Sequence, residues 1–165
     1  MQGDSKSQFQ VGIMYADGAG VEVSMDKAHH YLELAASSGY AVAHFNLGVY
    51  YAAGRGVEQS FEIAADHYRK AADAGVTRAA YNLGLCYISG KGVPKDEVAG
   101  AKYIMRAANL GDIEALYSAG VMYSQGRGVE RDEAKAKFYW EEAAKSGHSR
   151  SITALQESDS VELVL

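Results

Sequence analysis

The sequence has little cysteine and no clustered positive charge, and each shortage excludes a class of protein. Its single cysteine, Cys86, cannot form an intrachain disulfide, which argues against a disulfide-stapled secreted domain and fits a reducing compartment. The formal net charge is −5 and no run of Lys or Arg occurs. Because affinity for a phosphate backbone comes largely from these two residues, we expect no nucleic-acid partner.

The sequence also lacks an apolar stretch of membrane-spanning length, and its first residues contain no apolar signal segment. We therefore expect no direct membrane insertion and a soluble protein, located by default in the cytoplasm. Apolar residues make up 48% of the chain and charged residues 22%. This balance is sufficient to bury a core and is not typical of disorder.

Glycine, in contrast, is abundant, and most of the 18 glycines recur with a period of 36 residues. A fixed period of this length indicates a solenoid of stacked supersecondary units. Valines, tyrosines and alanine pairs follow the same period without insertion or deletion. The recurring positions include Gly12, Gly48, Gly84 and Gly120; the pairs Gly18/Gly20, Gly54/Gly56, Gly90/Gly92 and Gly126/Gly128; Gly39, Gly75, Gly111 and Gly147; and Tyr15, Tyr51, Tyr87 and Tyr123.

Each repeat has the pattern of two helices. Ala43, Leu47 and Tyr51 fall on one helical face at i, i+4 and i+8. The Gly-x-Gly-Val element ends this helix, because glycine adopts the positive φ that a helix terminus favours. Gly48 lies inside the helix at a cost of about 1 kcal/mol relative to alanine, so we expect another helix to pack closely against it. Asp96 and its equivalent are placed to cap the second helix.

These patterns predict an all-α fold, a right-handed α/α superhelix (solenoid) of four 36-residue helix-hairpin repeats with a C-terminal capping helix. One hairpin cannot bury its apolar faces alone, so neighbouring repeats must stack. We expect a single domain over 1–157 and a flexible tail over 158–165. Within that domain the predicted repeats are 5–39, 40–75, 76–111 and 112–147, followed by the capping helix at 149–157.

The second repeat contains Ala43…Leu47-Gly48…Tyr51, then Gly54-Arg55-Gly56-Val57, then Ala64…Ala71-Ala72…Gly75, and the third copies this order from Ala79 to Gly111. This pattern resembles the Sel-one-like repeat (SLR) family over nearly the whole chain. It departs from the family at Gly100, where alanine is expected, and at Ala119, where leucine is expected. We also expect the first helix to be cut short or capped.

The resemblance implies a superhelix like that of tetratricopeptide repeats, with a concave groove lined by the first helix of each pair. It implies an adaptor or scaffold whose partner is a protein or peptide. The family's secreted branch carries disulfides between paired helices, and this chain lacks those cysteines. We expect no cofactor, no metal and no catalytic residue.

By similarity to tetratricopeptide grooves, residues just before each Leu-Gly pair are expected to face the concavity. Aromatic rings there offer rigid apolar area, and amides offer hydrogen bonds to an extended backbone. The alternative is that the rings fill the core between hairpins, while the amides are solvated or bond between repeats. The residues predicted to bind the partner are Phe45, Asn46, Arg78, Tyr81, Asn82, Glu114, Tyr117 and Ser118.

Three groups of residues that suggest chemistry have simpler explanations. Ser24 and Lys27 match a Ser-x-x-Lys spacing, but the motifs that accompany it in penicillin-recognising enzymes are absent. His29 and His30 adjoin carboxylates, whereas a zinc site needs three or four convergent ligands. The basic loop residues, such as Arg55, are expected to be solvated.

We therefore expect a non-catalytic interaction scaffold that binds a peptide or protein segment in its concave groove. Two alternatives stay open. One is a structural or oligomerising module of a larger protein, and the other, implied by the resemblance, is a hydrolase of the kind suggested for some secreted relatives. The sequence leaves the oligomeric state open.

Overall fold

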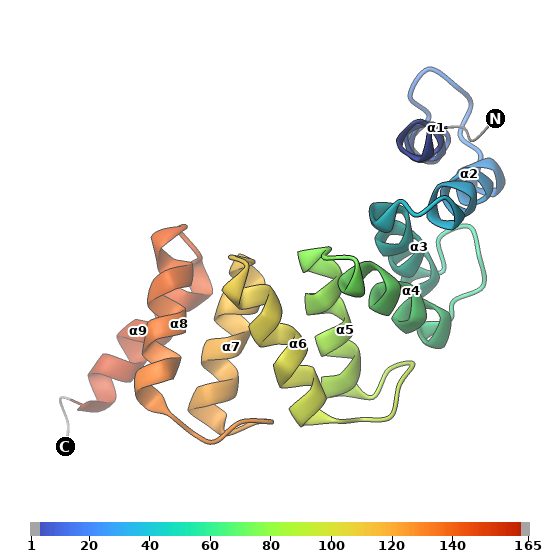
Figure 1. Ribbon diagram of the computed structural model, residues 1–165. Helices are drawn as coiled ribbons and strands as arrows, with labels where there is room; N and C mark the ends of the chain where they lie inside the picture. The colour runs from blue at the N-terminus through green and yellow to red at the C-terminus, as the bar shows by residue number, and fades with distance from the viewer. Residues whose placement is uncertain (1–3, 163–165) are drawn as a thin grey trace. The chain divides into compact units, whose positions relative to one another are not determined.

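The structure is a computed structural model that describes residues 4–162, with side chains over 4–158. Within these residues the chain forms nine α-helices and no strand (Figure 1). None of the described helices combines the length and apolar character needed to cross a bilayer. In chain order the helices are α1 (Ser5–Asp17), α2 (Met25–Ser37), α3 (Ala41–Ala53), α4 (Phe61–Asp73), α5 (Thr77–Ser89), α6 (Glu97–Asn109), α7 (Ile113–Gln125), α8 (Glu133–Lys145) and α9 (Ser149–Glu162).

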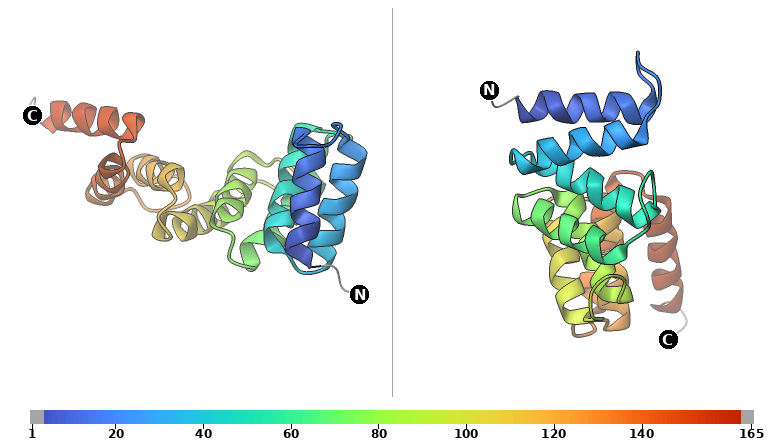
Figure 2. Two further views of the ribbon diagram at one scale, coloured as in Figure 1. Left: turned by 90° about the horizontal axis from the view of Figure 1, so that it is seen from above. Right: turned by 90° about the vertical axis from the view of Figure 1, so that its right-hand side faces the viewer.

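The helices group into two compact units, and each unit is described by itself. Unit 1 comprises residues 1–83 and 91–94, and unit 2 comprises residues 84–90 and 95–165. In unit 1, α1 packs against α2, α2 against α3 and α3 against α4, and Figure 2 shows α1 beside α2 in both views. In unit 2, α7 packs against α6 and α8, and α8 packs against α9. These helices therefore pack mainly against their neighbours in the chain, as in a quasi-one-dimensional stack.

Every second helix begins at a side-chain cap. Oδ1 of Asp96 accepts the backbone N–H three residues further on at 2.9 Å, and Oδ1 of Asp132 does the same at 3.0 Å. The predicted capping role of Asp96 and its equivalent is thus confirmed. Ser24 and Ser60 cap α2 and α4 in the same way, with longer distances of 3.4 and 3.3 Å. A cap of this kind contributes about 1 kcal/mol to stability.

The mid-helix glycines allow the two helices of a hairpin to approach closely. A β-carbon at Gly48 would lie 2.6 Å from the Tyr68 ring, and one at Gly84 would lie 2.7 Å from the Ile104 side chain. Both distances are too short for non-bonded carbon atoms, so the close packing predicted at these positions is confirmed. The cost of glycine inside the helix is offset by contact between helices.

Gly100 departs from the family's alanine because of a larger neighbour. A β-carbon at this position would lie 2.8 Å from Ile88, which stands where the second repeat has Ala52. A larger side chain on α5 is therefore accommodated by a smaller residue on α6. Such paired volume changes preserve packing density in a core.

In the second, third and fourth repeats, the second glycine of the Gly-x-Gly pair lies against a helix of the preceding repeat. Gly128, with φ of 68°, lies against the backbone carbonyl of Glu97, and a β-carbon there would overlap that carbonyl. Gly92 meets the Phe61 carbonyl in the same way. In the first repeat a β-carbon at Gly20 would meet nothing within 4 Å. The close contact therefore requires a preceding repeat, whose second helix lies against the loop. Among the described residues, the first repeat has no such neighbour.

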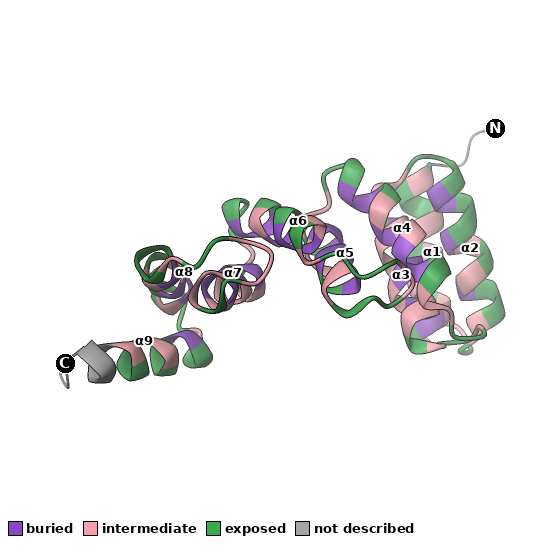
Figure 3. Cartoon of the chain, turned by 90° about the horizontal axis from the view of Figure 1, so that it is seen from below, coloured by how far each residue is buried: buried purple, intermediate pink, exposed green. Residues whose placement is uncertain are grey.

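Alanine dominates the core. In each of α2, α4 and α6 both members of the alanine pair are buried, as at Ala71 and Ala72. Small side chains permit short distances between helices, and a few large residues fill the remaining space. The largest fully buried hydrophobic residues are Leu32, Leu47, Leu83 and Ile104. Figure 3 shows the resulting pattern, in which buried and exposed residues share each helix.

Two sequence expectations need correction at the ends of the chain. Of the two alternatives for the first helix, the shortened helix is wrong, because α1 has 13 residues, as many as each of α2 to α8. The capped helix is confirmed, because the Asp4 carboxylate accepts the Lys6 N–H at 3.3 Å. The last helix does not end at residue 157, since α9 continues to Glu162. Gln156 is exposed on this helix. The rest of the predicted tail, residues 163–165, lies outside the described residues.

Candidate functional site

A stacked pair of rings joins the two helices of every hairpin. Tyr87 stacks on Tyr103 with ring centroids 5.7 Å apart and an interplanar angle of 4°. The other pairs have centroid distances of 5.7–5.8 Å and angles of 9–12°. The recurring tyrosines of the first helices therefore pack inside their own repeats. The remaining pairs are Tyr15–Tyr31, Tyr51–His67 and Tyr123–Tyr139.

In unit 1 the predicted partner-binding residues already make contacts within the fold. Phe45 is half-buried, with its ring centroid 6.2 Å from that of Tyr68. The Asn46 amide donates to a backbone carbonyl of its own helix, Val42, at 2.9 Å. The Arg78 guanidinium lies 5.9 Å from the centroid of the Tyr81 ring. Asn82 is half-buried beside Leu83 in the same helix.

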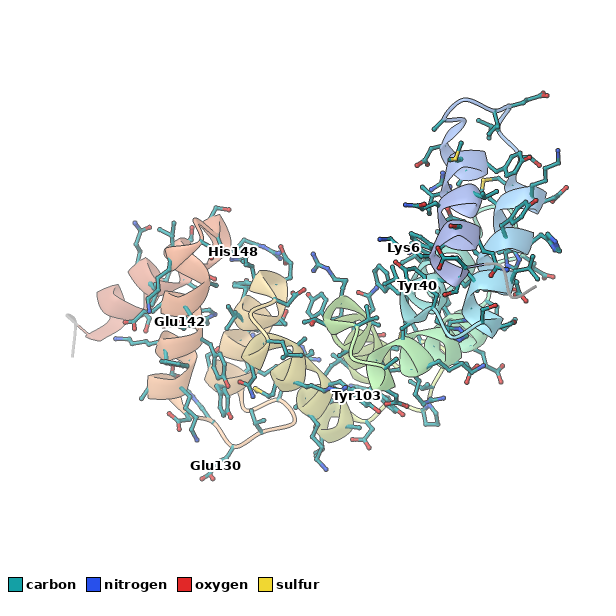
Figure 4. The ribbon with its side chains drawn as sticks, turned by 45° about the horizontal axis from the view of Figure 1, so that its top comes forward. Lys6, Tyr40, Tyr103, Glu130, Glu142 and His148 are labelled. Carbon is teal, nitrogen blue, oxygen red and sulfur yellow. The ribbon has the colours of Figure 1, made fainter. Side chains whose placement is uncertain are left out.

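In unit 2 the predicted residues Glu114 and Tyr117 contact the start of the last helix. Arg150 donates to the Glu114 carboxylate, and its guanidinium lies 4.6 Å from the Tyr117 ring centroid. The ring of His148, which is labelled in Figure 4 and lies between α8 and α9, has its centroid 5.1 Å from that of the same tyrosine. Ser118, one residue further along α7, is half-buried. The last helix is therefore fastened to α7 by charge and by aromatic contact.

The same turn brings together a serine, a histidine and a carboxylate. The Ser151 N–H donates to His148 Nδ1 at 3.3 Å, and the Ser151 hydroxyl lies 2.9 Å from this nitrogen. Since Nδ1 accepts, Nε2 carries the proton and points to Glu114, 3.5 Å away. Ser151 is 0% exposed, so its hydroxyl cannot reach a substrate. The arrangement is a helix cap and not a nucleophile with its base.

Two adjoining hollows lie on the first-helix face of unit 2. The smaller, of about 180 Å³, is lined by residues that include Leu85, Ile88 and Ser118. The larger, of about 580 Å³, lies among α7, α8 and α9 and is lined mainly by other residues, such as Ser124, Gln125, Arg131, Glu133, Ala154 and Glu157. Tyr117 and Val121 line both. Of the predicted residues, only Tyr117 and Ser118 line these hollows.

Unit 1 contains three histidines around Tyr51. His44 Nδ1 and His67 Nδ1 are 3.0 Å apart, so one ring donates and the other accepts. His67 stacks on Tyr51, and His29 meets the same ring edge-on with centroids 5.2 Å apart. Burial, followed by the charges of His44 and Lys70, lowers the pKa of His67 to about 4. Burial likewise lowers the pKa of His44, so both rings are neutral at pH 7.

The histidines do not assemble a metal centre. Nδ1 of His29 lies 3.9 Å from the Glu33 carboxylate, four residues further along the same helix. Over residues 4–158, no group of three or more His, Cys, Asp or Glu side chains could hold a metal ion. His29 Nε2 is buried without a hydrogen-bond partner.

The basic loop residues are solvated, as expected, with side chains of Arg55 and Arg127 47% and 43% exposed, and they also contact the preceding repeat. Arg55 donates to the Ala16 carbonyl at 3.1 Å and lies 3.4 Å from Asp17. Its equivalent Arg127 lies 3.3 Å from the Glu97 carboxylate. In each case the cation reaches a helix end of the preceding repeat. These side chains therefore contribute to spacing as well as to surface charge.

Four similar helix hairpins with a further helix define a helical-repeat solenoid protein, as predicted. The Sel1 repeat family model matches residues 5–40, 41–76, 77–112 and 113–148. The chain belongs to the Sel1 repeat family, and the resemblance drawn from its glycines and alanines is confirmed. Proteins of this family generally serve as scaffolds for protein interactions.

Solved structures with the same fold come from several bacteria. A protective antigen of uropathogenic Escherichia coli is 34% identical with a TM-score of 0.89, over 90% of this chain and 32% of that one. A Sel1 repeat protein from Oxalobacter formigenes is 32% identical with a TM-score of 0.89, over 93% of this chain and 63% of that one. The chain thus spans less than two thirds of either relative.

A more distant structure shares the fold alone. Cysteine rich protein B of Helicobacter pylori is 24% identical with a TM-score of 0.61, over 83% of this chain and all of that one. No curated protein sequence matches the chain.

Proposed function

We propose that this chain is a non-catalytic protein-interaction scaffold that binds a peptide segment on the first-helix face of unit 2. The observation that supports this most directly is the pair of hollows sharing Tyr117 and Val121. The smaller hollow is largely apolar and includes Leu85, which is 40% exposed. The larger has a mixed lining, with Ser124 and Gln125 beside Val121 and Trp140. Apolar side chains of a bound segment would enter the first, while its backbone would meet amides and hydroxyls in the second.

Tyr117 would act as the central anchor of this surface. Its ring contacts both Arg150 and His148, which restricts its orientation before a partner arrives. A fixed aromatic ring loses little entropy on binding and offers a large apolar area. Ser118 supplies a hydroxyl beside it. Glu114, which is engaged by Arg150, would act through the position of Tyr117.

The predicted residues of unit 1 form a second part of the proposal. Phe45, Asn46, Arg78, Tyr81 and Asn82 lie on the first helices of their repeats. Asn46 and Arg78 already contact their own helices, so a partner would meet them as ordered groups. We place the stronger part of the binding surface in unit 2, where hollows accompany the residues.

A charge placed in the smaller hollow tests the proposal. Leu85→Glu puts a carboxylate on an exposed wall of the hollow without entering the core, so the fold should persist. Ile63→Glu is the matched control, since Ile63 is 42% exposed on α4 and lies outside both hollows. Proteins captured from a lysate by the parent and by the control, but not by Leu85→Glu, would support the surface. Peptides from those proteins should then bind the parent at least about tenfold more tightly than Leu85→Glu.

If Leu85→Glu retains the partners of the parent, the assignment to this face is wrong. Loss of the same partners by both variants would place binding elsewhere. Thermal unfolding followed by circular dichroism shows whether each variant keeps its helices.

A second function is a structural or oligomerising module of a longer protein. The observation that favours it is that the chain covers only 32% and 63% of two related structures. Sedimentation equilibrium across a concentration series tests it. A mass that doubles at micromolar concentration would favour the module, and a constant monomer mass would favour the scaffold.

A further inference from the structure

A second surface lies on the outer face of α6 in unit 2, away from the residues proposed to bind a peptide. It is a hollow of about 840 Å³, with Val98, Met105 and Leu110 among its lining residues. Gly128 and Val129 of the following loop form one wall. Val98 and Leu110 are 55% and 60% exposed, high values for large apolar side chains. Figure 3 shows exposed positions along this helix.

The lining residues of α6 follow one helical stripe at i, i+4, i+7, i+8 and i+12 from Val98. At 1.5 Å per residue this stripe is about 18 Å long, or about three turns. A groove along a helix with this periodicity fits the apolar face of another helix. We name the stripe with its loop wall the α6 outer surface.

Among the second helices of the repeats (α2, α4, α6 and α8), only α6 combines apolar residues with two cations in this stripe. Where α6 has Val98, Lys102, Met105 and Arg106, α4 has Glu62, Asp66, Arg69 and Lys70. On α4 the charges pair within the helix, with Lys70 Nζ 2.7 Å from Asp66. The α4 stripe is therefore a solvated surface of mixed sign.

The α6 stripe carries two cations and no acidic residue. Lys102 and Arg106 are both exposed and stand at i, i+4 spacing, which is mildly unfavourable for like charges in an isolated helix. The chain as a whole has a net charge of −5, so a basic patch here runs against the general composition. Apolar residues flanked by cations complement a partner with the opposite sign.

We propose that the α6 outer surface docks an acidic amphipathic helix of a partner protein. The apolar side of this helix would pack on Val98, Met105 and Leu110. Its carboxylates would lie beside Lys102 and Arg106. The proposal goes beyond the peptide-binding face, since none of these residues lines either of its hollows.

Two synthetic peptides test the charge and the apolar contact separately. Both carry leucines at i, i+3, i+4 and i+7, and one carries glutamates where the other carries lysines. In fluorescence anisotropy the acidic peptide should bind the parent at least about tenfold more tightly than the basic one. In the double variant Lys102→Glu/Arg106→Glu the preference should reverse. Met105→Glu should weaken binding of the acidic peptide, because it places a like charge in the apolar contact.

Matched controls distinguish binding at the α6 outer surface from a general attraction between the charged peptide and the whole protein. Lys70→Glu changes the α4 position equivalent to Arg106 and should leave the preference unchanged. Leu85→Glu, which tests the peptide-binding face, should also leave binding of the acidic peptide unchanged, so each proposal can fail independently. Equal binding of the two peptides, no binding of either, or an equal loss in Lys70→Glu would overturn the proposal.

A second copy of the chain is the alternative occupant. Sedimentation velocity of the parent and of Met105→Glu distinguishes it. A parent dimer that Met105→Glu converts to monomer would overturn the proposal in favour of self-association. A parent monomer that binds the acidic peptide would support it.

Discussion

Unit 1 and unit 2 repeat one 36-residue pattern, yet their variable positions have different surroundings. In unit 1 the variable residues include His29, His44 and His67, which turn toward one another around a tyrosine. In unit 2 other variable positions line hollows, one around Val121 and one around Met105. The invariant positions make the stack in both. Function can therefore differ between units without any change of fold.

The largest expected effect compares loops of the first and last repeats. Gly20→Ala meets no neighbour and should cost about 1 kcal/mol, from positive φ alone. Gly128→Ala has the same φ cost and in addition overlaps the carbonyl of Glu97. We expect it to cost at least about 3 kcal/mol, because backbone at both sides must shift. Urea unfolding followed by circular dichroism measures both, and equal losses would show that the loop contact does not space the repeats.

The next effect is a pH dependence of the free energy of unfolding that arises from the histidines of unit 1. His67 has a folded pKa of about 4 against an ordinary value of 6.5, so the unfolded chain binds its proton more readily. Stability should be fully present above about pH 6.5 and fall as the pH drops toward 4. Lys70 and His29 also oppose the protonation of His67, while Asp66 favours it. Because solvent screens a partly exposed ring, we expect a loss of about 1–2 kcal/mol.

His67→Tyr is the matched control for this effect. It restores the tyrosine that the other three repeats have at this position, so the stacked pair with Tyr51 should remain. Urea unfolding of parent and variant at pH 7 and pH 5 should show a smaller pH-dependent loss in the variant. If both lose the same stability, carboxylates and not the histidine pair cause the dependence.

The repeat architecture could be predicted from sequence because its glycines answer local requirements of the backbone. Gly48 has no room for a β-carbon, and Asp96 caps the helix that follows it by accepting the backbone N–H three residues further on. Such requirements recur at a fixed period and are visible without a structure. Even Gly100, noted as a departure, marked a position where a neighbour is larger.

The candidate site could be predicted only in part, because it depends on side chains far apart in the sequence. Arg150 and Glu114 stand one full repeat apart, and nothing local indicates that they pair. The pairing of Tyr51 with His67 could have been found, since the equivalent residue is tyrosine in the other three repeats. The hollows could not have been predicted from the sequence, because they arise where side chains fail to fill space.

The smallest expected effect on folding comes from the predicted amides of unit 1. The Asn46 amide donates to a carbonyl of its own helix, a bond that contributes little at a partly exposed site. Asn46→Ala with Asn82→Ala should therefore change the free energy of unfolding by less than about 1 kcal/mol. Partner affinity should nevertheless fall if the peptide-binding face extends into unit 1, because the amides would lose bonds to the bound backbone. Calorimetric titration with the captured peptide measures the affinity of this double variant, and the Leu85→Glu variant of unit 2 is titrated for comparison. Weaker binding in Leu85→Glu alone would confine the face to unit 2, since an amide that serves only its own helix has no part in recognition.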